Sequence, residues 1–211
     1  MYMQKVDMNT YPRKVHFDYF RAMGYPYVGL TSNVDITQVV GKARERGHSS
    51  FLYLLYAAGN AANSVQEFRQ RIDGDGIVEY EFCRTSHTVM KTDGTYAYCE
   101  ADPTLSFERF MEETARNQEK VLASGGLEEE SDPNSLFFIS CLPWVSYTSL
   151  IQPVPFPADS NPRITWGKYF TEEGRLMLPV SVLAHHALID GRQIADFYES
   201  LSQGLVKECF I

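Results

Sequence analysis

Apolar residues recur along the chain with two spacings, one typical of helices and the other typical of strands. The helical spacing predicts helices over residues 38–46, from 51 to about 64, from 106 to the glycine pair at 125–126, and from 190–191 to about 207. Gly47 follows the first helix, where glycine commonly ends one. Either Asp35 or Thr37 can cap that helix, and either Ser49 or Ser50 can cap the second through a side-chain oxygen.

Runs rich in β-branched and aromatic residues predict the strands. They span residues 27–34, 77–83, 87–91, 95–99, 136–144 with a break at Pro143, 164–171 and 175–184. The three runs between 77 and 99 predict an antiparallel meander, and the last two predict a hairpin around residues 172–174. The acidic stretch 128–132 is typical of a solvated loop, and the proline-dotted segment 152–162 is also expected to be a loop.

Helices and strands are interspersed without a regular βαβ repeat, and neither an internal repeat nor a linker is visible. The helix over residues 51–64 is apolar on nearly all sides, so we expect it to lie under a sheet. The pattern therefore predicts one α/β domain over residues 1–211, a two-layer sandwich of a mixed β-sheet with helices packed on one side.

Composition narrows the possible partners. The chain has 211 residues, of which 44% are hydrophobic, and its formal net charge of −8 disfavours DNA or an anionic membrane surface as a partner. The start of the chain lacks the apolar region of a signal peptide, and the most apolar stretch, residues 51–59, is about half as long as a membrane span. We therefore expect a cytoplasmic protein.

The cysteines and histidines do not form a metal-ligand pattern. Cys83, Cys99, Cys141 and Cys209 lie far apart, which indicates free thiols in a reducing compartment. His185 and His186 are adjacent, so on a strand their side chains point to opposite faces and do not share one ion. No metal is expected.

The segment His185-His186-Ala-Leu-Ile-Asp190-Gly places two histidines at the end of an apolar strand and an aspartate just before a helix. A histidine at such a junction can reach a cleft, and its near-neutral pKa suits removal of a proton from an attacking hydroxyl or thiol. From these residues alone, a second interpretation fits equally well. In it Asp190 caps the last helix and the histidines are half-buried turn residues.

This segment fits the pattern HHxxxDG, and the chain resembles the chloramphenicol acetyltransferase family almost from end to end. The matching segments keep the family's order and spacing, and they are residues 13–21, 30–37, 139–145, 164–169 and 178–182. The resemblance implies the coenzyme-A-dependent acyltransferase fold. It also implies acetyl-coenzyme A as donor and a small, mostly apolar acceptor with a reactive hydroxyl, most directly chloramphenicol.

The resemblance also implies the catalytic roles. His186 is expected to be the general base, and the acceptor oxygen then attacks the acetyl thioester directly in a ternary complex, without a cysteine nucleophile. His185 belongs to the structural lead-in. Asp190 is expected to be structural and paired with Arg13.

Ser140 is expected to stabilise the oxyanion that forms during attack, and Thr165 is expected to assist the same transition state through water. Considered without the resemblance, Ser140 is a satisfied hydroxyl in a buried strand.

Further residues match the binding positions of the family. Tyr19, Phe20 and Tyr96 correspond to the aromatic acceptor pocket, although each also suits core packing. Lys168 and Tyr169 offer coenzyme A a cation for phosphate and an aromatic face for adenine, although an exposed strand end explains them as well.

The family resemblance implies a homotrimer with active sites at subunit interfaces, so that His186 faces pocket residues of a neighbour. The chain departs from the family mainly over residues 22–26 and 152–157, where the acceptor is chosen, so another hydroxyl or amine compound is also open as acceptor.

Two alternatives remain. One is an acyltransferase acting on a lipoyl-type thiol, as in the cores of 2-oxo-acid dehydrogenase complexes, although no lipoyl domain or linker is visible. The other is an inactive trimeric scaffold that binds a hydrophobic small molecule. Saturable binding of acetyl-coenzyme A would distinguish an enzyme from such a scaffold.

Overall fold

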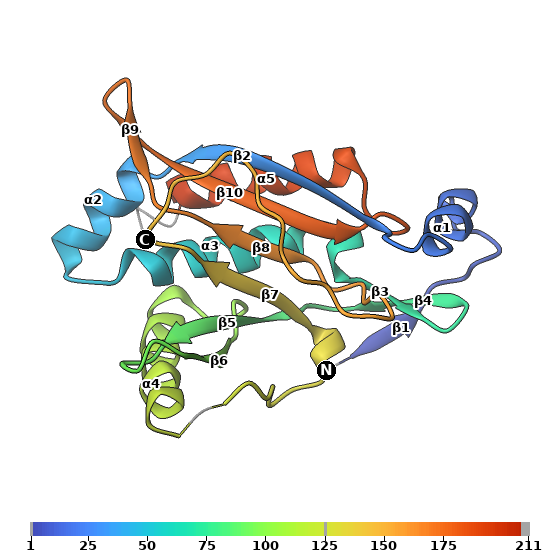
Figure 1. The fold of residues 1–211 in the computed structure, drawn as a ribbon, viewed down its shortest axis with the longest axis horizontal. Coiled ribbons are helices and arrows are strands. Elements are labelled where there is room, and N and C mark those ends of the chain that lie inside the picture. Colours follow the sequence, from blue (N-terminus) through green and yellow to red (C-terminus); the bar gives the residue numbers. More distant parts are fainter. Residues whose placement is uncertain (1, 125, 208–211) are drawn as a thin grey trace.

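The computed structural model describes residues 2–124 and 126–207 (Figure 1). Its helices are α1 (Lys14–Arg21), α2 (Thr37–Arg46), α3 (Ser50–Ser64), α4 (Phe107–Ser124) and α5 (Gly191–Lys207), with 3-10 turns at Gln66–Arg69 and Pro133–Ser135. Its strands are β1 (Met3–Lys5), β2 (Tyr27–Asp35), β3 (Gln70–Asp73), β4 (Gly76–Tyr80), β5 (Arg84–Met90), β6 (Tyr96–Ala101), β7 (Leu136–Cys141), β8 (Arg163–Trp166), β9 (Phe170–Glu172) and β10 (Arg175–His185).

The main sheet is mixed. Its strands follow the order β2-β10-β8-β7-β5-β6, with β9 added beside β10. The pairs β5–β7 and β7–β8 are parallel, and the other pairs of this sheet are antiparallel. Because β7 and β8 are parallel, their carboxyl ends lie side by side. These ends carry the candidate site residues Ser140 and Thr165.

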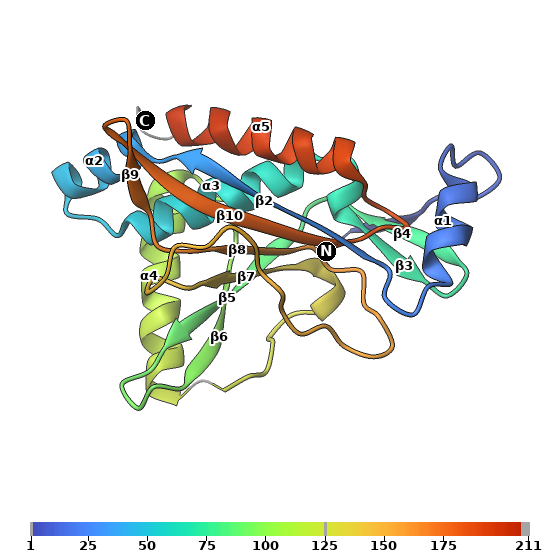
Figure 2. The ribbon, with the colours of Figure 1, turned by 45° about the horizontal axis from the view of Figure 1, so that its top comes forward.

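The two faces of this sheet differ in what covers them. On β10, Leu178, Val180, Val182 and Ala184 alternate into the hydrophobic core beneath the helices. Figure 2 shows α3 and α5 together on one side of the strands. The side chains at the alternate positions of β10 point to the other face of the sheet, away from these helices. The predicted two-layer α/β architecture with a mixed sheet and helices on one side is confirmed.

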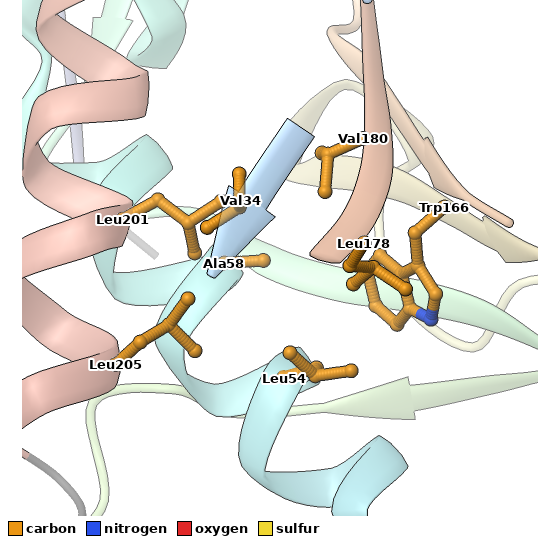
Figure 3. A pocket seen from close by; sticks show the side chains of 8 residues that line it. All are labelled: Val34, Leu54, Ala58, Trp166, Leu178, Val180, Leu201 and Leu205. Atoms are coloured by element: carbon orange, nitrogen blue, oxygen red, sulfur yellow. The ribbon is translucent and has the colours of Figure 1, made fainter. Parts of the chain in front are cut away.

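Helix α3 lies at the centre of the helical layer because small residues let its neighbours approach closely. Ala57, Ala58, Ala61 and Ala62 are all buried. A Cβ added at Gly59 would lie 2.9 Å from the Pro103 Cβ. Between α3, α5 and the sheet is an apolar void of about 10 Å³ (Figure 3). Such a void is at the lower limit for one water molecule and has no polar groups to bind it.

The expected meander is wrong in its first strand. Strand β4 lies in a separate three-stranded sheet, in the order β1-β4-β3, and is not paired with β5. Met3 pairs with Tyr80 there, a contact between distant segments that local sequence does not reveal. Strands β5 and β6 do form the expected antiparallel pair, and the other neighbour of β5 is the parallel strand β7.

The expected strand over residues 164–171 is interrupted. It ends at Trp166 because the chain passes very close to the preceding loop at Gly167. A Cβ there would lie 2.7 Å from the Val145 carbonyl oxygen and 2.8 Å from the Tyr147 ring. The chain then re-enters the sheet as β9, which forms the expected hairpin with β10.

The helix boundaries agree closely with the sequence analysis. The Asp35 carboxylate accepts hydrogen bonds from the Thr37 backbone N–H at 2.9 Å and from its hydroxyl at 2.6 Å just before α2, whose N-cap residue is Ile36 and makes no side-chain capping bond. Gly47 ends that helix with a φ of 67°. Ser49 precedes α3 and makes no side-chain capping bond. Helix α1 and strands β1 and β3 were not predicted.

Cys83 and Cys99 are buried, Cys141 is partly buried, and all three are free thiols; Cys209 lies outside the described residues. Burial raises the pKa of Cys99 to about 12 and that of Cys141 to about 11, so both are protonated at neutral pH. Within the described residues, none of the helices has the length and apolar content that crossing a bilayer requires.

Candidate active site

The last residues of β10 lead directly into the predicted catalytic segment. His185 is 2% exposed, and its Nδ1 accepts a hydrogen bond from the Ala187 backbone N–H at 3.2 Å. Burial lowers the pKa of His185 to about 4, an effect that the Asp159 charge opposes and the neighbouring His186 reinforces. His185 is therefore neutral at pH 7 and serves as a fixed part of the strand end.

His186 is oriented by three contacts. Its backbone N–H donates to the Pro26 carbonyl at 2.7 Å, its Nδ1 lies 2.9 Å from the Ile189 carbonyl oxygen, and the Phe20 ring lies 3.8 Å from its imidazole. A carbonyl oxygen only accepts hydrogen bonds, so Nδ1 carries a hydrogen, and in the neutral ring the lone pair is then on Nε2. That tautomer is the one a general base needs.

Asp190 combines the two roles that sequence reasoning left open. Its Oδ1 accepts from the Arg192 backbone N–H at 2.9 Å, which caps α5, while its Oδ2 forms an ion pair with Arg13. Burial alone would raise the pKa of Asp190, but these hydrogen bonds and the positive charge of Arg13 hold it below its usual range. Arg13 precedes α1, which carries Phe20, so the ion pair ties the Phe20 helix to the turn of His186.

A second group of predicted residues lies in a cleft of about 1120 Å³ lined mainly by the strands β5–β8 and the loop after β7, with Phe51 of α3 and Gln118 of α4 also in its lining. Ser140 and Thr165 are paired neighbours on β7 and β8, and both line the cleft, as does Tyr96. The Thr165 hydroxyl donates to the Gln152 Oε1 at 3.3 Å. The Tyr147 hydroxyl donates to the Thr165 carbonyl at 2.8 Å.

The cleft and His186 are separated within one chain. Thr165 pairs with Ser181 on β10, and His186 follows Ser181 by five residues. At about 3.3 Å per strand residue, roughly 16 Å separates the two positions along β10. His186 does not line the cleft. One chain therefore brings together Arg13, Asp190 and His186, and separately Ser140 and Thr165, but not the two groups.

The remaining predicted residues are more exposed. Tyr19 is 64% exposed and packs edge-on against Phe20, with ring centroids 5.1 Å apart. Lys168 and Tyr169 are exposed just beyond β8 and do not line the cleft.

Sequence reasoning missed Glu129. The acidic stretch 128–132 was expected to be a solvated loop, but Glu129 is half-buried, lines the cleft and accepts a hydrogen bond from the Ser86 hydroxyl at 2.8 Å. Burial raises the pKa of Glu129. The nearby Glu100 charge adds to this rise, and the hydrogen bond from Ser86 opposes it. A run of acidic residues gives no local signal for such a contact, because Ser86 is 43 positions away.

The model of a family described as chloramphenicol acetyltransferase (CAT) matches residues 1–202. A chloramphenicol acetyltransferase of Clostridium perfringens is 27% identical over 211 residues, covering 96% of this chain and 98% of that protein. One of Streptomyces acrimycini is 30% identical over 190 residues, covering 88% of this chain and 86% of that protein.

Solved structures give the same picture. A chloramphenicol acetyltransferase structure superposes on this chain with a TM-score of 0.83 at 29% identity. The match covers 97% of this chain and 100% of the other. The dihydrolipoamide acetyltransferase of Azotobacter vinelandii has a TM-score of 0.70 at 19% identity, covering 93% of this chain and 88% of that one. At that identity the second likeness shows the fold alone.

Proposed function

Because this chain belongs to the chloramphenicol acetyltransferase family of acyltransferases, we propose that it transfers acetyl from acetyl-coenzyme A to a hydroxyl of a small, mostly apolar acceptor. The family membership predicted from the HHxxxDG segment is confirmed by the family match and the full-length relatives. Chloramphenicol is the first acceptor to test, since it is the one that the relatives are named for.

The observation that carries this proposal is the state of the His186 ring. With Nδ1 donating to the Ile189 carbonyl, Nε2 is the free base. The acceptor O–H gives its proton to Nε2 while its oxygen bonds to the thioester carbonyl carbon. The tetrahedral intermediate then expels the coenzyme A sulfur, which recovers the proton from His186. Acetyl passes directly between the two substrates, in keeping with protonated cysteines.

Ser140 and Thr165 supply the second half of this chemistry. We assign the Ser140 hydroxyl to the developing oxyanion, a contact worth about 3 kcal/mol in comparable sites. Thr165 lies beside it on β8 and assists through water. The Arg13–Asp190 pair positions the His186 turn without touching the substrate.

The binding residues follow the family positions. Phe20 packs on His186, and Tyr96 lines the cleft, so these rings and Tyr19 are assigned to the acceptor. The exposed Lys168 and Tyr169 are assigned to coenzyme A, as a cation for phosphate and an aromatic face for adenine.

We propose that the enzyme works as a homotrimer of single-domain chains. The separation of roughly 16 Å along β10 supports a site in which His186 of one copy faces the cleft of the next. We also propose that the enzyme is cytoplasmic, because the donor acetyl-coenzyme A is available there.

The test is release of free thiol from acetyl-coenzyme A by purified protein, with and without chloramphenicol, beside His186→Ala. Chloramphenicol-dependent release that the variant loses is the expected result. No release with intact binding of acetyl-coenzyme A would move the acceptor elsewhere. No binding of acetyl-coenzyme A would overturn the acyltransferase proposal for this chain.

A further inference from the structure

The cleft contains one carboxylate whose charge has no counterpart. Glu129 lines the cleft, and only its Oε1 is occupied, by the Ser86 hydroxyl at 2.8 Å. Its Oε2 is buried and accepts no hydrogen bond within the part of the chain that the structure describes. Across those same residues no lysine, arginine or histidine lies within ion-pair distance of Glu129. A half-buried anion in this state is costly unless something else binds it.

The cations near this end of the cleft are already neutralised. Arg163 lines the cleft, but both of its terminal nitrogens donate to Asp159, at 2.8 and 2.7 Å. Arg84 pairs with Glu100 at 3.0 Å. The charge that remains at this end is therefore negative and belongs to Glu129.

The loop that carries Glu129 is held on both sides, which fixes the carboxylate in place. Glu100 accepts a hydrogen bond from the Ser131 backbone N–H at 2.7 Å. On the other side, the Tyr98 backbone N–H donates to the Gly126 carbonyl at 3.0 Å. A binding group fixed in this way loses little entropy when a ligand arrives.

Glu129 also lies a small molecule's length from the proposed reacting end. Ser86 pairs with Phe138 on β7, and Ser140 is two residues further along that strand on the same face. The rise along one strand and the spacing between two place Ser86 and Ser140 about 8 Å apart at Cα. The rings of Tyr96 and Tyr98, 6.0 Å apart, line the same wall, and aromatic faces attract cations.

We propose that the acceptor is an amino alcohol whose protonated amine binds Glu129 while its hydroxyl is acetylated beside Ser140. This inference rests on the proposed function for the position of the reacting hydroxyl. The amine would approach Glu129 from the cleft that this residue lines and supply the positive charge that its carboxylate lacks.

Two probes isolate the charge. One is the amino diol left when the dichloroacetyl group of chloramphenicol is removed, and the other is its neutral N-acetyl derivative, which keeps the same hydroxyls. Binding of each to the full chain is measured by titration calorimetry at pH 7. The wild type is expected to bind the amine about tenfold or more tightly than the derivative. Glu129→Gln should abolish that preference, and Glu130→Gln, the same change at an exposed neighbour, should keep it.

The results separate the two proposals. Equal or weaker binding of the amine by the wild type overturns the inference without any variant, as does a preference that persists in Glu129→Gln. Acetylation of chloramphenicol without a charge preference leaves the proposed function standing and overturns the amine site. A charge preference that depends on Glu129, without acetyl transfer to either probe and without binding of acetyl-coenzyme A, supports the amine site and overturns the proposed function.

Discussion

Thr165 on β8 pairs with Ser181 on β10, and this register fixes where the cleft lies relative to the proposed base. His186 follows Ser181 by five residues, so the proposed general base and the proposed oxyanion residues lie at separate places on the same sheet. The proposed reaction, in which both act on one substrate, would therefore draw on two copies of the chain.

Mixed assemblies test this arrangement. His186→Ala and Ser140→Ala chains are each expected to be nearly inactive alone. Unfolding and refolding them together at equal amounts should restore about one quarter of the wild-type rate, because that fraction of the interfaces joins an intact His186 to an intact Ser140. Thiol release gives the rate. His186→Ala refolded with the double variant is the control, and activity no higher than this control would contradict an interface site.

Two substitutions at Asp190 separate the cap from the ion pair. Asp190→Asn keeps the oxygen that caps α5 but loses the charge that holds Arg13. We expect kcat to fall on the order of 10- to 100-fold, because the His186 turn shifts, with little change in KM. Asp190→Ala also removes the cap and should lower the stability by about a further 1 kcal/mol. Steady-state kinetics and thermal unfolding check the two effects, and an unchanged kcat in Asp190→Asn would speak against the positioning role.

Two helical glycines, Gly41 in α2 and Gly59 in α3, should respond oppositely to alanine. Gly41→Ala in α2 meets nothing within 4 Å and should raise the free energy of unfolding by about 0.5–1 kcal/mol. Gly59→Ala in α3 gains the same helix propensity, but its Cβ would lie 2.9 Å from Pro103 and 3.1 Å from Thr85. Crowding in a packed core costs about 1–3 kcal/mol, so the net change should be destabilising. Denaturant unfolding at equal protein concentration measures both.

Stability should fall in acid partly because of His87. Burial lowers the pKa of this histidine to about 3, well below its value of 6.5 in an unfolded chain. Below pH 6.5 the unfolded chain therefore binds a proton that the folded chain does not. The stabilisation is fully present above pH 6.5 and is lost toward pH 3 at about 1.4 kcal/mol per pH unit.

His87→Gln removes this titration while keeping a polar atom near the position of the His87 Nε2, which lies 2.9 Å from the Gln118 Nε2. Between pH 6.5 and 4 the variant should lose stability less steeply than the wild type by about that slope. His185 titrates in the same direction in both proteins and cancels in the comparison. Parallel slopes would show that His87 is not the group responsible.

Local signals predicted most of the helices and the residues at the end of β10. Asp35 and Gly47 mark the ends of α2 by chemistry that acts within a few residues, so their roles are visible in the sequence. The HHxxxDG segment and Arg13 were found by resemblance to a family, although they are 177 positions apart. Their pairing could not have been worked out from either segment alone.

What the sequence analysis missed depends on long-range contacts. Strand β4 has the composition of a meander strand, but its long-range partner is β1, at the start of the chain, and its hairpin neighbour is β3. The role of Glu129 is decided by Ser86 on β5 and by the Glu100 network, neither of which is adjacent to it in sequence. A run of acidic residues predicts a solvated loop, and only the contacts of this loop with the sheet show that one of its side chains is half-buried.

The distance along β10 has a genetic consequence. If each site takes its base from one copy and its cleft from another, a cell with two alleles makes sites of mixed parentage. A defective allele would then impair sites built with normal chains, while two different defective alleles, one at His186 and one in the cleft, would together partly restore the activity. The activity of such a cell would then depend on which pairs of chains meet at each interface, and not on either chain alone.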